Sequence, residues 1–145
     1  MPGETSIRRA APADYPRIVE ILTASGLPLA GLHGPDDFLV LCAKDEVIGC
    51  AAIERYGRVG LLRSVAVTAT ERNRGLGRFL IEELLTRARQ EQLAELVLLT
   101  TTAEKFFFRI GFRIIQRGQV PLAAQSSVEF QSACPASATV MLLKL

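Results

Sequence analysis

Several sequence features are scarce or absent in this chain of 145 residues, and each absence argues against a class of protein. Long apolar runs are absent: none approaches the roughly 18 residues that cross a bilayer. The first residues, MPGETSIRRAAPADY, contain two arginines with no apolar stretch behind them, which disfavours an export signal. We therefore expect a cytoplasmic protein without a membrane partner.

Cysteine and histidine are too few for the common metal and nucleophile sites. Cys42, Cys50 and Cys134 form an odd set without C-x-x-C spacing, which argues against a disulfide framework and a cysteine-rich zinc site. Catalysis by a Ser/His/Asp group would rest on His33, the only histidine, and no G-x-S-x-G elbow accompanies it. His33 lies in a turn-like stretch, either as an ordinary loop residue or at a substrate pocket. We expect no metal, and Cys50 is expected in the core.

A strong excess of one charge is also missing. The 17 lysines and arginines against 15 aspartates and glutamates leave a formal net charge of +2, too mild for the basic patch of a nucleic-acid binder. Hydrophobic residues make up 49% of the chain and charged residues 22%, which indicates a folded core and not a disordered chain. We expect one globular domain over residues 1–145, in which any anion site is local.

Two periodicities alternate along the chain. Apolar residues at helical spacing predict helices from Pro12 to near Gly26, from Leu76 to Ala88 and over 103–110. The middle helix joins two strands as a β-α-β crossover, so these strands should be parallel. The fold class is therefore mixed α/β, with an antiparallel first half, a central parallel pair and a long loop over 118–137. Apolar runs bounded by turn residues predict strands over residues 6–10, 38–43, 47–56, 61–67, 95–100, 112–116 and 139–145.

The stretch Arg72-Asn73-Arg74-Gly75-Leu76-Gly77-Arg78 lies between a predicted strand and a predicted helix start. Glycines let the backbone approach a ligand, the first N–H groups of a helix lack internal partners, and the helix dipole favours negative charge. Three arginines add positive charge at the same point. This stretch predicts a pyrophosphate cradle built largely from main chain, with no need of a metal ion.

Two familiar phosphate motifs do not fit this stretch. A P-loop requires G-x-x-x-x-G-K-[ST], a string that the chain lacks. A dinucleotide fingerprint follows its strand directly, whereas here seven residues separate Val67 from Gly75, and Leu80 stands where the third glycine belongs. We therefore expect neither a P-loop nor a dinucleotide site.

The same stretch resembles the signature of a known family. Arg72-x-x-Gly75-x-Gly77 is similar to the [RQ]-x-x-G-x-[GA] motif of the Gcn5-related N-acetyltransferases, or GNAT superfamily. The later segment FFFRIGF, residues 106–112, resembles the family's FY-x-x-x-GF segment, and the resemblance spans nearly the whole chain. More narrowly, residues 60–67, 128–130 and 134–137 resemble a branch of small acetyltransferases found with arsenic-resistance genes.

This resemblance implies a GNAT-like, mostly antiparallel sheet whose central parallel strands, 61–67 and 95–101, splay apart between flanking helices. Acetyl-CoA would lie between these strands, with its pantetheine arm bound like an added strand. A backbone N–H near Val65 would polarise the acetyl carbonyl. The residues implied to bind acetyl-CoA are Val65, Ala66, Val67, Arg72, Asn73, Arg74, Gly75, Leu76, Gly77, Arg78, Thr101 and Phe107.

The implied reaction is direct attack by an amine that has first lost a proton. Glu54, on the strand beside the cofactor strand, is the first candidate for the catalytic base, although a solvated ion pair with Arg55 or Arg63 explains it equally well. Glu129, in the late loop, is the second candidate. Arg63 is costly in an apolar strand unless it faces a cleft or has a partner, so it either holds a carboxylate of the acceptor or pairs with Glu54. With Ser64 and Glu129 it forms the expected substrate site.

Phe107 departs from the family pattern. It stands where many members have a tyrosine that protonates the leaving thiolate, and it has no hydroxyl, so that role would fall to water or Tyr56. Two hypotheses follow. The first is an acetyl-CoA-dependent N-acetyltransferase for a primary amine of a small molecule, such as an amino-acid-like toxic compound or an arsenical. The second is an acyl-CoA-binding sensor with little turnover. A homodimer is also implied, and no nucleic-acid partner is expected.

Overall fold

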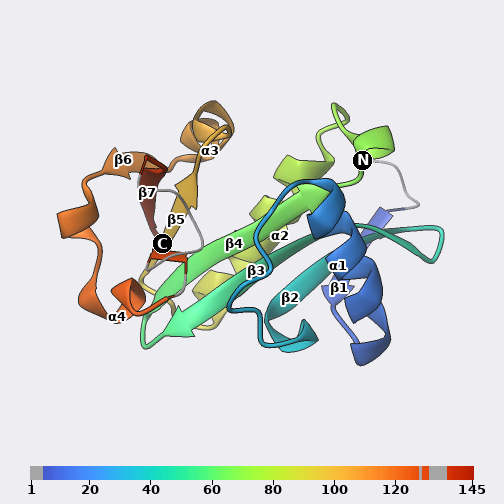
Figure 1. Cartoon of the computed structure of the whole chain (residues 1–145), viewed down its shortest axis with the longest axis horizontal. Helices are drawn as coiled ribbons and strands as arrows, with labels where there is room; N and C mark the ends of the chain where they lie inside the picture. The colour runs from blue at the N-terminus through green and yellow to red at the C-terminus, as the bar shows by residue number, and fades with distance from the viewer. Residues whose placement is uncertain (1–4, 128, 131–136) are drawn as a thin grey trace.

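A computed structural model of the chain describes residues 5–127, 129–130 and 137–145. The predicted strands over 38–43 and 95–100 are confirmed residue for residue, and the other predicted strands and helices are confirmed with shifted ends. Figure 1 shows the elements in space. They follow in the order β1 (Thr5–Arg9), α1 (Tyr15–Ala24), β2 (Phe38–Ala43), β3 (Glu46–Tyr56), β4 (Val59–Val67), α2 (Leu76–Gln90), β5 (Glu95–Thr100), α3 (Glu104–Ile110), β6 (Arg113–Ile115), α4 (Leu122–Gln125) and β7 (Thr139–Lys144).

The described strands form one seven-stranded sheet in the order β1-β2-β3-β4-β5-β7-β6. Strands β1 to β4 are an antiparallel meander, and β7 lies antiparallel between β5 and β6. The pair β4 and β5 is parallel, because α2 carries the chain back across the sheet between them. The predicted mixed α/β class, with an antiparallel first half and a parallel central pair, is therefore confirmed.

The two parallel strands separate soon after they meet. Their described pairing consists of Val59 with Glu95, Gly60 with Leu96 and Leu61 with Val97. Beyond Leu61, β4 continues to Val67 along β3, while β5 rises toward α3 in Figure 1. The main chain of β4 on this side therefore has hydrogen-bonding groups that the ladder with β5 does not use, as the predicted splay requires.

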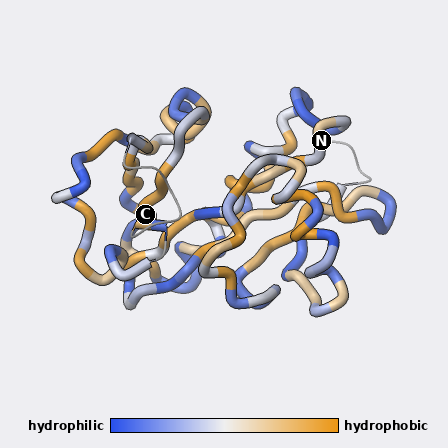
Figure 2. Tube along the Cα trace, viewed as in Figure 1, coloured by the Kyte–Doolittle hydropathy of each residue, from blue (hydrophilic) through white to orange (hydrophobic). Residues whose placement is uncertain are grey.

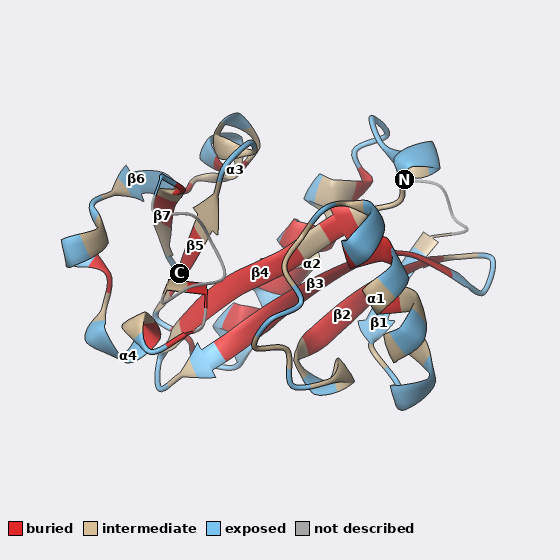
Figure 3. Cartoon of the chain, in the orientation of Figure 1, coloured by how far each residue is buried: buried red, intermediate tan, exposed pale blue. Residues whose placement is uncertain are grey.

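Helices cover both faces of the sheet. On one face α2 buries a stripe that includes Leu80 and Leu84, and Phe107 of α3 packs into the same cluster. On the other face α1 buries Ile18, Ile21 and Leu22 over β2 and β3, and α4 contributes Ala124 to a separate cluster over β4 and β5. Figure 2 shows the hydrophobic residues gathered along the central strands, and Figure 3 shows the same strands buried.

The predicted loop over 118–137 is wrong in part. It contains α4, four residues that follow Pro121, and a 3₁₀ turn over Arg117–Gln119 precedes it. A helix this short has no full apolar period, so its pattern is invisible in sequence. The predicted first helix is also divided, into a 3₁₀ turn over Pro12–Asp14 and α1. Val128 and the segment 134–136, which carried part of the arsenic-branch resemblance, lie outside the described residues.

Candidate functional site

A cavity of about 480 Å³ lies where β4 and β5 separate. The loop after α1 (26–28), β4, the end of β5 and the start of α3 all contribute to its lining. Of the site residues predicted from sequence, six line this cavity, and the predicted base Glu54 does not. The six are Arg63, Ser64, Val65, Thr101, Phe107 and Glu129.

The edge of β4 at this cavity carries a β-bulge. Ala52 pairs with Arg63 and Cys50 pairs with Ala66, so Ser64 and the residue after it oppose the single residue Ala51. Ser64 has a φ of 58°, in the left-handed region that costs a residue with a side chain about 1 kcal/mol or more. A bulge redirects the main chain locally, and bulges are common beside active sites. Val65, the second residue of the bulge, lines the cavity.

Arg63 is the centre of a buried polar network on the α1 face. Its side chain has no exposed area, and Nη1 lies 2.9 Å from Oε2 of Glu54. Nη2 lies 3.4 Å from Oε2 of Glu129 and donates to the carbonyl oxygen of Pro28 at 3.2 Å. Nε donates to Oγ of Ser64 at 3.2 Å. The predicted pairing of Arg63 with Glu54 is confirmed, and the expected solvation of that pair is wrong.

Glu54 lies behind Arg63 and away from the cavity. It accepts hydrogen bonds from the hydroxyls of Tyr56 at 2.6 Å and Ser127 at 2.7 Å. Burial raises the pKa of this carboxyl, but the hydrogen bonds from Tyr56, Ser127 and Arg63 outweigh burial and lower the pKa overall. A carboxylate this well satisfied is a poor base. The hydroxyl of Tyr56 is likewise committed to Glu54, which argues against Tyr56 as the acid.

The loop between β4 and α2 has the backbone expected of an anion cradle. Gly75 is the N-cap of α2 with a φ of 74°, and Asn73 before it has a φ of 66°. Gly75 has no side chain with which to cap the helix, so the N–H groups of the first turn are available to a ligand. Leu76 is buried in the core, which anchors the start of this 15-residue helix.

The three arginines of this loop are arranged unequally. Arg72 braces the end of β4, because its Nε donates to the carbonyl oxygen of Val67 at 3.0 Å and its Nη2 to Ser25 at 3.3 Å. Arg74 and Arg78 pair with glutamates of their own loop and helix, and about half of each side chain is exposed. Arg72 thus shapes the loop, while Arg74 and Arg78 supply the positive charge that faces solvent.

Phe107 both packs in the core and lines the cavity. Its ring meets Phe106 edge to face at a centroid distance of 5.0 Å and Phe112 at 5.6 Å. Phe108 differs, since it is 51% exposed with the Arg113 guanidinium 4.8 Å above its ring. Phe108 therefore lies outside the core, whereas Phe107 and Phe112 are buried in it.

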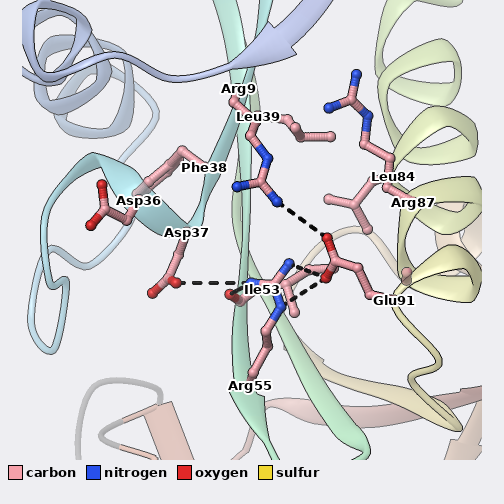
Figure 4. A pocket seen from close by; sticks show the side chains of 11 residues that line it. Arg9, Asp36, Asp37, Phe38, Leu39, Ile53, Arg55, Leu84, Arg87 and Glu91 are labelled. Atoms are coloured by element: carbon pink, nitrogen blue, oxygen red, sulfur yellow. Dashed lines mark hydrogen bonds and ion pairs between the residues drawn. The ribbon is translucent and has the colours of Figure 1, made fainter.

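A second charged hollow lies at the end of α2 and is shown in Figure 4. Glu91 accepts hydrogen bonds from Arg55 at 2.6 and 2.9 Å and from Arg9 at 3.4 Å, and Arg55 lies 3.9 Å from Asp37. The hollow holds only about 30 Å³, roughly the volume of one water molecule. The ion pairs of Glu91 hold β1 and β3 against the end of α2. The hollow itself is too small for an acceptor.

Other predicted features are less informative. His33 is exposed in the loop between α1 and β2 and does not line the cavity between β4 and β5. Among the described residues, no group of three or more His, Cys, Asp or Glu side chains could hold a metal ion. In that same part of the chain, no helix combines the length and apolar character needed to cross a membrane.

Two residues of the buried polar network were not predicted from sequence. They are Pro28 and Ser127, whose roles as partners of Arg63 and Glu54 have no local signal.

Comparisons with known proteins agree with this geometry. Residues 34–114 match the model of the acetyltransferase (GNAT) domain. An uncharacterized N-acetyltransferase of Chlorobaculum tepidum is 33% identical over 82% of both chains, and an amino-acid acetyltransferase of Mycobacterium tuberculosis is 31% identical over 76% of this chain and 69% of its own.

Solved structures extend the likeness over nearly the whole chain. A Mycobacterium tuberculosis protein in complex with CoA superposes with a TM-score of 0.82 and 26% identity, covering 97% of this chain and 99% of that one. The N-acetylglutamate synthase of Neisseria gonorrhoeae superposes with a TM-score of 0.83 and 21% identity, and there the likeness spans 97% of this chain but 35% of the synthase. The chain belongs to the GNAT family and is an acetyl-CoA-dependent N-acetyltransferase.

Proposed function

We propose that this chain acetylates the primary amine of a small amino-acid-like molecule by direct attack on acetyl-CoA in a ternary complex. One observation carries the proposal: the cavity between β4 and β5 contains the buried pair of Arg63 and Glu129 in its lining. Relatives that are named amino-acid acetyltransferases support the same acceptor class.

An amino acid matches the charges of that pair. The contact between Arg63 and Glu129, at 3.4 Å, is the longer of the two ion pairs of Arg63, and Glu54 keeps the shorter one at 2.9 Å. A zwitterionic acceptor can enter the longer pair with its carboxylate on the guanidinium and its ammonium on Glu129. An amine without a carboxylate would bind Glu129 and leave the Arg63 guanidinium without a replacement for that ion pair, so it should bind more weakly.

Acetyl-CoA would be held largely by main chain. Val65 lines the cavity at the edge of β4, and Ala66 and Val67 would continue that edge along the pantetheine arm, with Thr101 and Phe107 on the facing wall. The N–H groups after Gly75 receive the pyrophosphate. The list of cofactor contacts in this loop runs over Arg72, Asn73, Arg74, Gly75, Leu76, Gly77 and Arg78, with Arg74 and Arg78 adding charge.

The acceptor ammonium has no lone pair, so it must lose a proton before it can attack. Glu129 is ion-paired with Arg63, so in this mechanism it binds the ammonium group of the acceptor and does not remove its proton. The amine then reacts in its neutral form after losing its proton to water. The N–H of Val65 stabilises the oxyanion that develops on the acetyl carbonyl as the C–N bond forms. When the C–S bond breaks, the remaining excess proton of the amine nitrogen passes through water to the CoA thiolate, without the family's tyrosine.

The experiment is a thiol-release assay with a panel of amino acids, each compared with its decarboxylated amine. We expect the amino acid of each pair to have the higher kcat/KM and its decarboxylated amine the lower one. An arsenic-containing amino acid in the panel tests the arsenic-resistance branch, which remains a prediction. Equal rates with and without the carboxylate would contradict the proposed acceptor class.

A variant pair sharpens the test. Glu129→Gln should raise the KM for the acceptor more than the KM for acetyl-CoA, whereas Glu20→Gln changes an exposed glutamate on α1 and should leave both unchanged. Acetyl-CoA binding by calorimetry, with no thiol release from any amine, would instead support the alternative of an acyl-CoA-binding sensor.

A further inference from the structure

Cys50 lies directly beneath the bulge of β4. It is on β3, fully buried, and its Sγ is 3.4 Å from the carbonyl oxygen of Ser64. Its register partner on β4 is Ala66, so it sits beside the point where the ladder between β3 and β4 slips. The reaction proposed above assigns no role to this thiol.

The bulge is a strained conformation that needs support. Ser64 has a φ of 58°, and such a residue persists only where its surroundings fix it. Two side chains hold it in this structure. Arg63 donates through Nε to the Ser64 hydroxyl at 3.2 Å, and the Cys50 thiol approaches the Ser64 carbonyl oxygen. The peptide that links Ser64 to Val65 is therefore anchored at its oxygen by a buried group.

We propose that Cys50 is a positioning residue for acetyl transfer: its thiol donates a hydrogen bond to the Ser64 carbonyl and so fixes the peptide whose N–H belongs to Val65. This inference rests on the proposed role of the Val65 N–H, because the carbonyl of Ser64 and the N–H of Val65 are the two ends of one planar peptide unit. Fixing the oxygen fixes the direction of the N–H, and an oxyanion donor works only when it is aimed in advance.

The chemical state of the thiol fits this role. Burial raises the pKa of Cys50 to about 12, against an opposing hydrogen bond from the backbone of Ala66, so the sulfur keeps its proton at neutral pH and can donate it. Its complete burial also keeps it from the acetyl group, which excludes a covalent role.

Three single variants test the inference in the assay with the best acceptor. Cys50→Ala removes the donor, and we expect kcat to fall about five- to tenfold with the KM for acetyl-CoA within about twofold. Cys50→Ser restores a donor of similar size and should recover most of the lost kcat. Cys42→Ala is the matched control, since Cys42 is a second buried thiol on the neighbouring strand β2, and its kcat should not change.

The outcomes separate the two proposals. A wild-type chain that releases no thiol with any amine would refute the proposed function. An active wild type in which Cys50→Ala keeps its full kcat, or loses no more than Cys42→Ala, would overturn the role of Cys50 alone. An equal loss in Cys50→Ala and Cys50→Ser would also overturn it, because packing and not the donor would then be responsible.

A spectroscopic measurement tests the hydrogen bond with Cys50 itself in place. In the double variant Cys42→Ala with Cys134→Ala, Cys50 is the only thiol of the chain. Its S–H stretching band in the Raman spectrum should lie below that of a thiol in an apolar solvent, as a donated hydrogen bond requires. A band at the position of the free thiol would refute the hydrogen bond on which the inference depends.

Discussion

Replacing Glu54 with glutamine is the sharpest test of the buried network. Glu54 accepts three hydrogen bonds, from Arg63 at 2.9 Å, Tyr56 at 2.6 Å and Ser127 at 2.7 Å, and its side chain is 8% exposed. Glutamine keeps the size but loses the charge, and its NH₂ group must face either Arg63 or the two hydroxyls of Tyr56 and Ser127. Arg63 then remains buried with Glu129 as its ion-pair partner.

The expected cost follows from this geometry. Breaking a buried ion pair costs about 3–5 kcal/mol, because the remaining charge stays out of water without compensation. Glu129 still faces the guanidinium of Arg63 at 3.4 Å, so we expect the lower end, about 3 kcal/mol at neutral pH. For a chain of this length that corresponds to a fall in Tm of about 10 °C.

The cost should also depend on pH in a definite direction. The folded-state pKa of Glu54 is lowered, so the stability it contributes is fully present above the ordinary glutamate pKa of about 4.3 and is lost as the pH falls below that value. The difference in unfolding free energy between the wild type and Glu54→Gln should therefore shrink in acid. Urea unfolding followed by circular dichroism at several pH values measures it.

Two results would refute this reasoning. One is a loss below about 1 kcal/mol at neutral pH, the value typical of an exposed pair. The other is a loss that stays constant as the pH is lowered. A double-mutant cycle with Arg63→Met checks the assignment of the partner, since the double variant should lose less stability than the sum of the two single losses.

Three further predictions concern other parts of the chain. Gly75→Ala should cost about 1 kcal/mol of stability and weaken CoA binding in calorimetry, because alanine is strained at a φ of 74°, whereas Gly118→Ala, in open space, should do neither. Glu91→Gln should cost less than about 1 kcal/mol in urea unfolding, since its arginine partners are 40% and 72% exposed; a cost like that of Glu54→Gln would contradict this view. The pH profile of kcat/KM should break at the pKa of the acceptor amine, so two acceptors of different amine pKa should give two different breaks; a shared break would reveal a base on the enzyme.

The sequence predicts the elements of the fold well where their signal is local. Strands β2 and β5 match because each is an apolar run with turn residues at both ends, and the Arg72 to Arg78 loop was found because its glycines and arginines are adjacent in sequence. The four-residue helix α4 was missed because it is shorter than the period that reveals a helix.

The candidate site depends more on contacts between distant segments. Ser127 donates to Glu54 across 73 positions of sequence, and Pro28 accepts from Arg63 across 35. No local pattern reveals such partners, so the sequence favours Glu54 as a catalytic base and as an ion-pair partner equally, whereas the structure shows a buried carboxylate that accepts three hydrogen bonds. The bulge at Ser64 has no sequence signal either, since serine is an unusual residue for a positive φ.

The brief contact between β4 and β5 makes the sheet two leaves joined along a short seam. One leaf is the meander β1 to β4 and the other is β5, β7 and β6, and between the two strands the described ladder has three residue pairs. A ligand that forms hydrogen bonds with the main chain of both leaves would hold them together for as long as it is bound. Acetyl-CoA would then slow amide hydrogen exchange in both leaves at once, and the enzyme would be at its most rigid when it is ready to react.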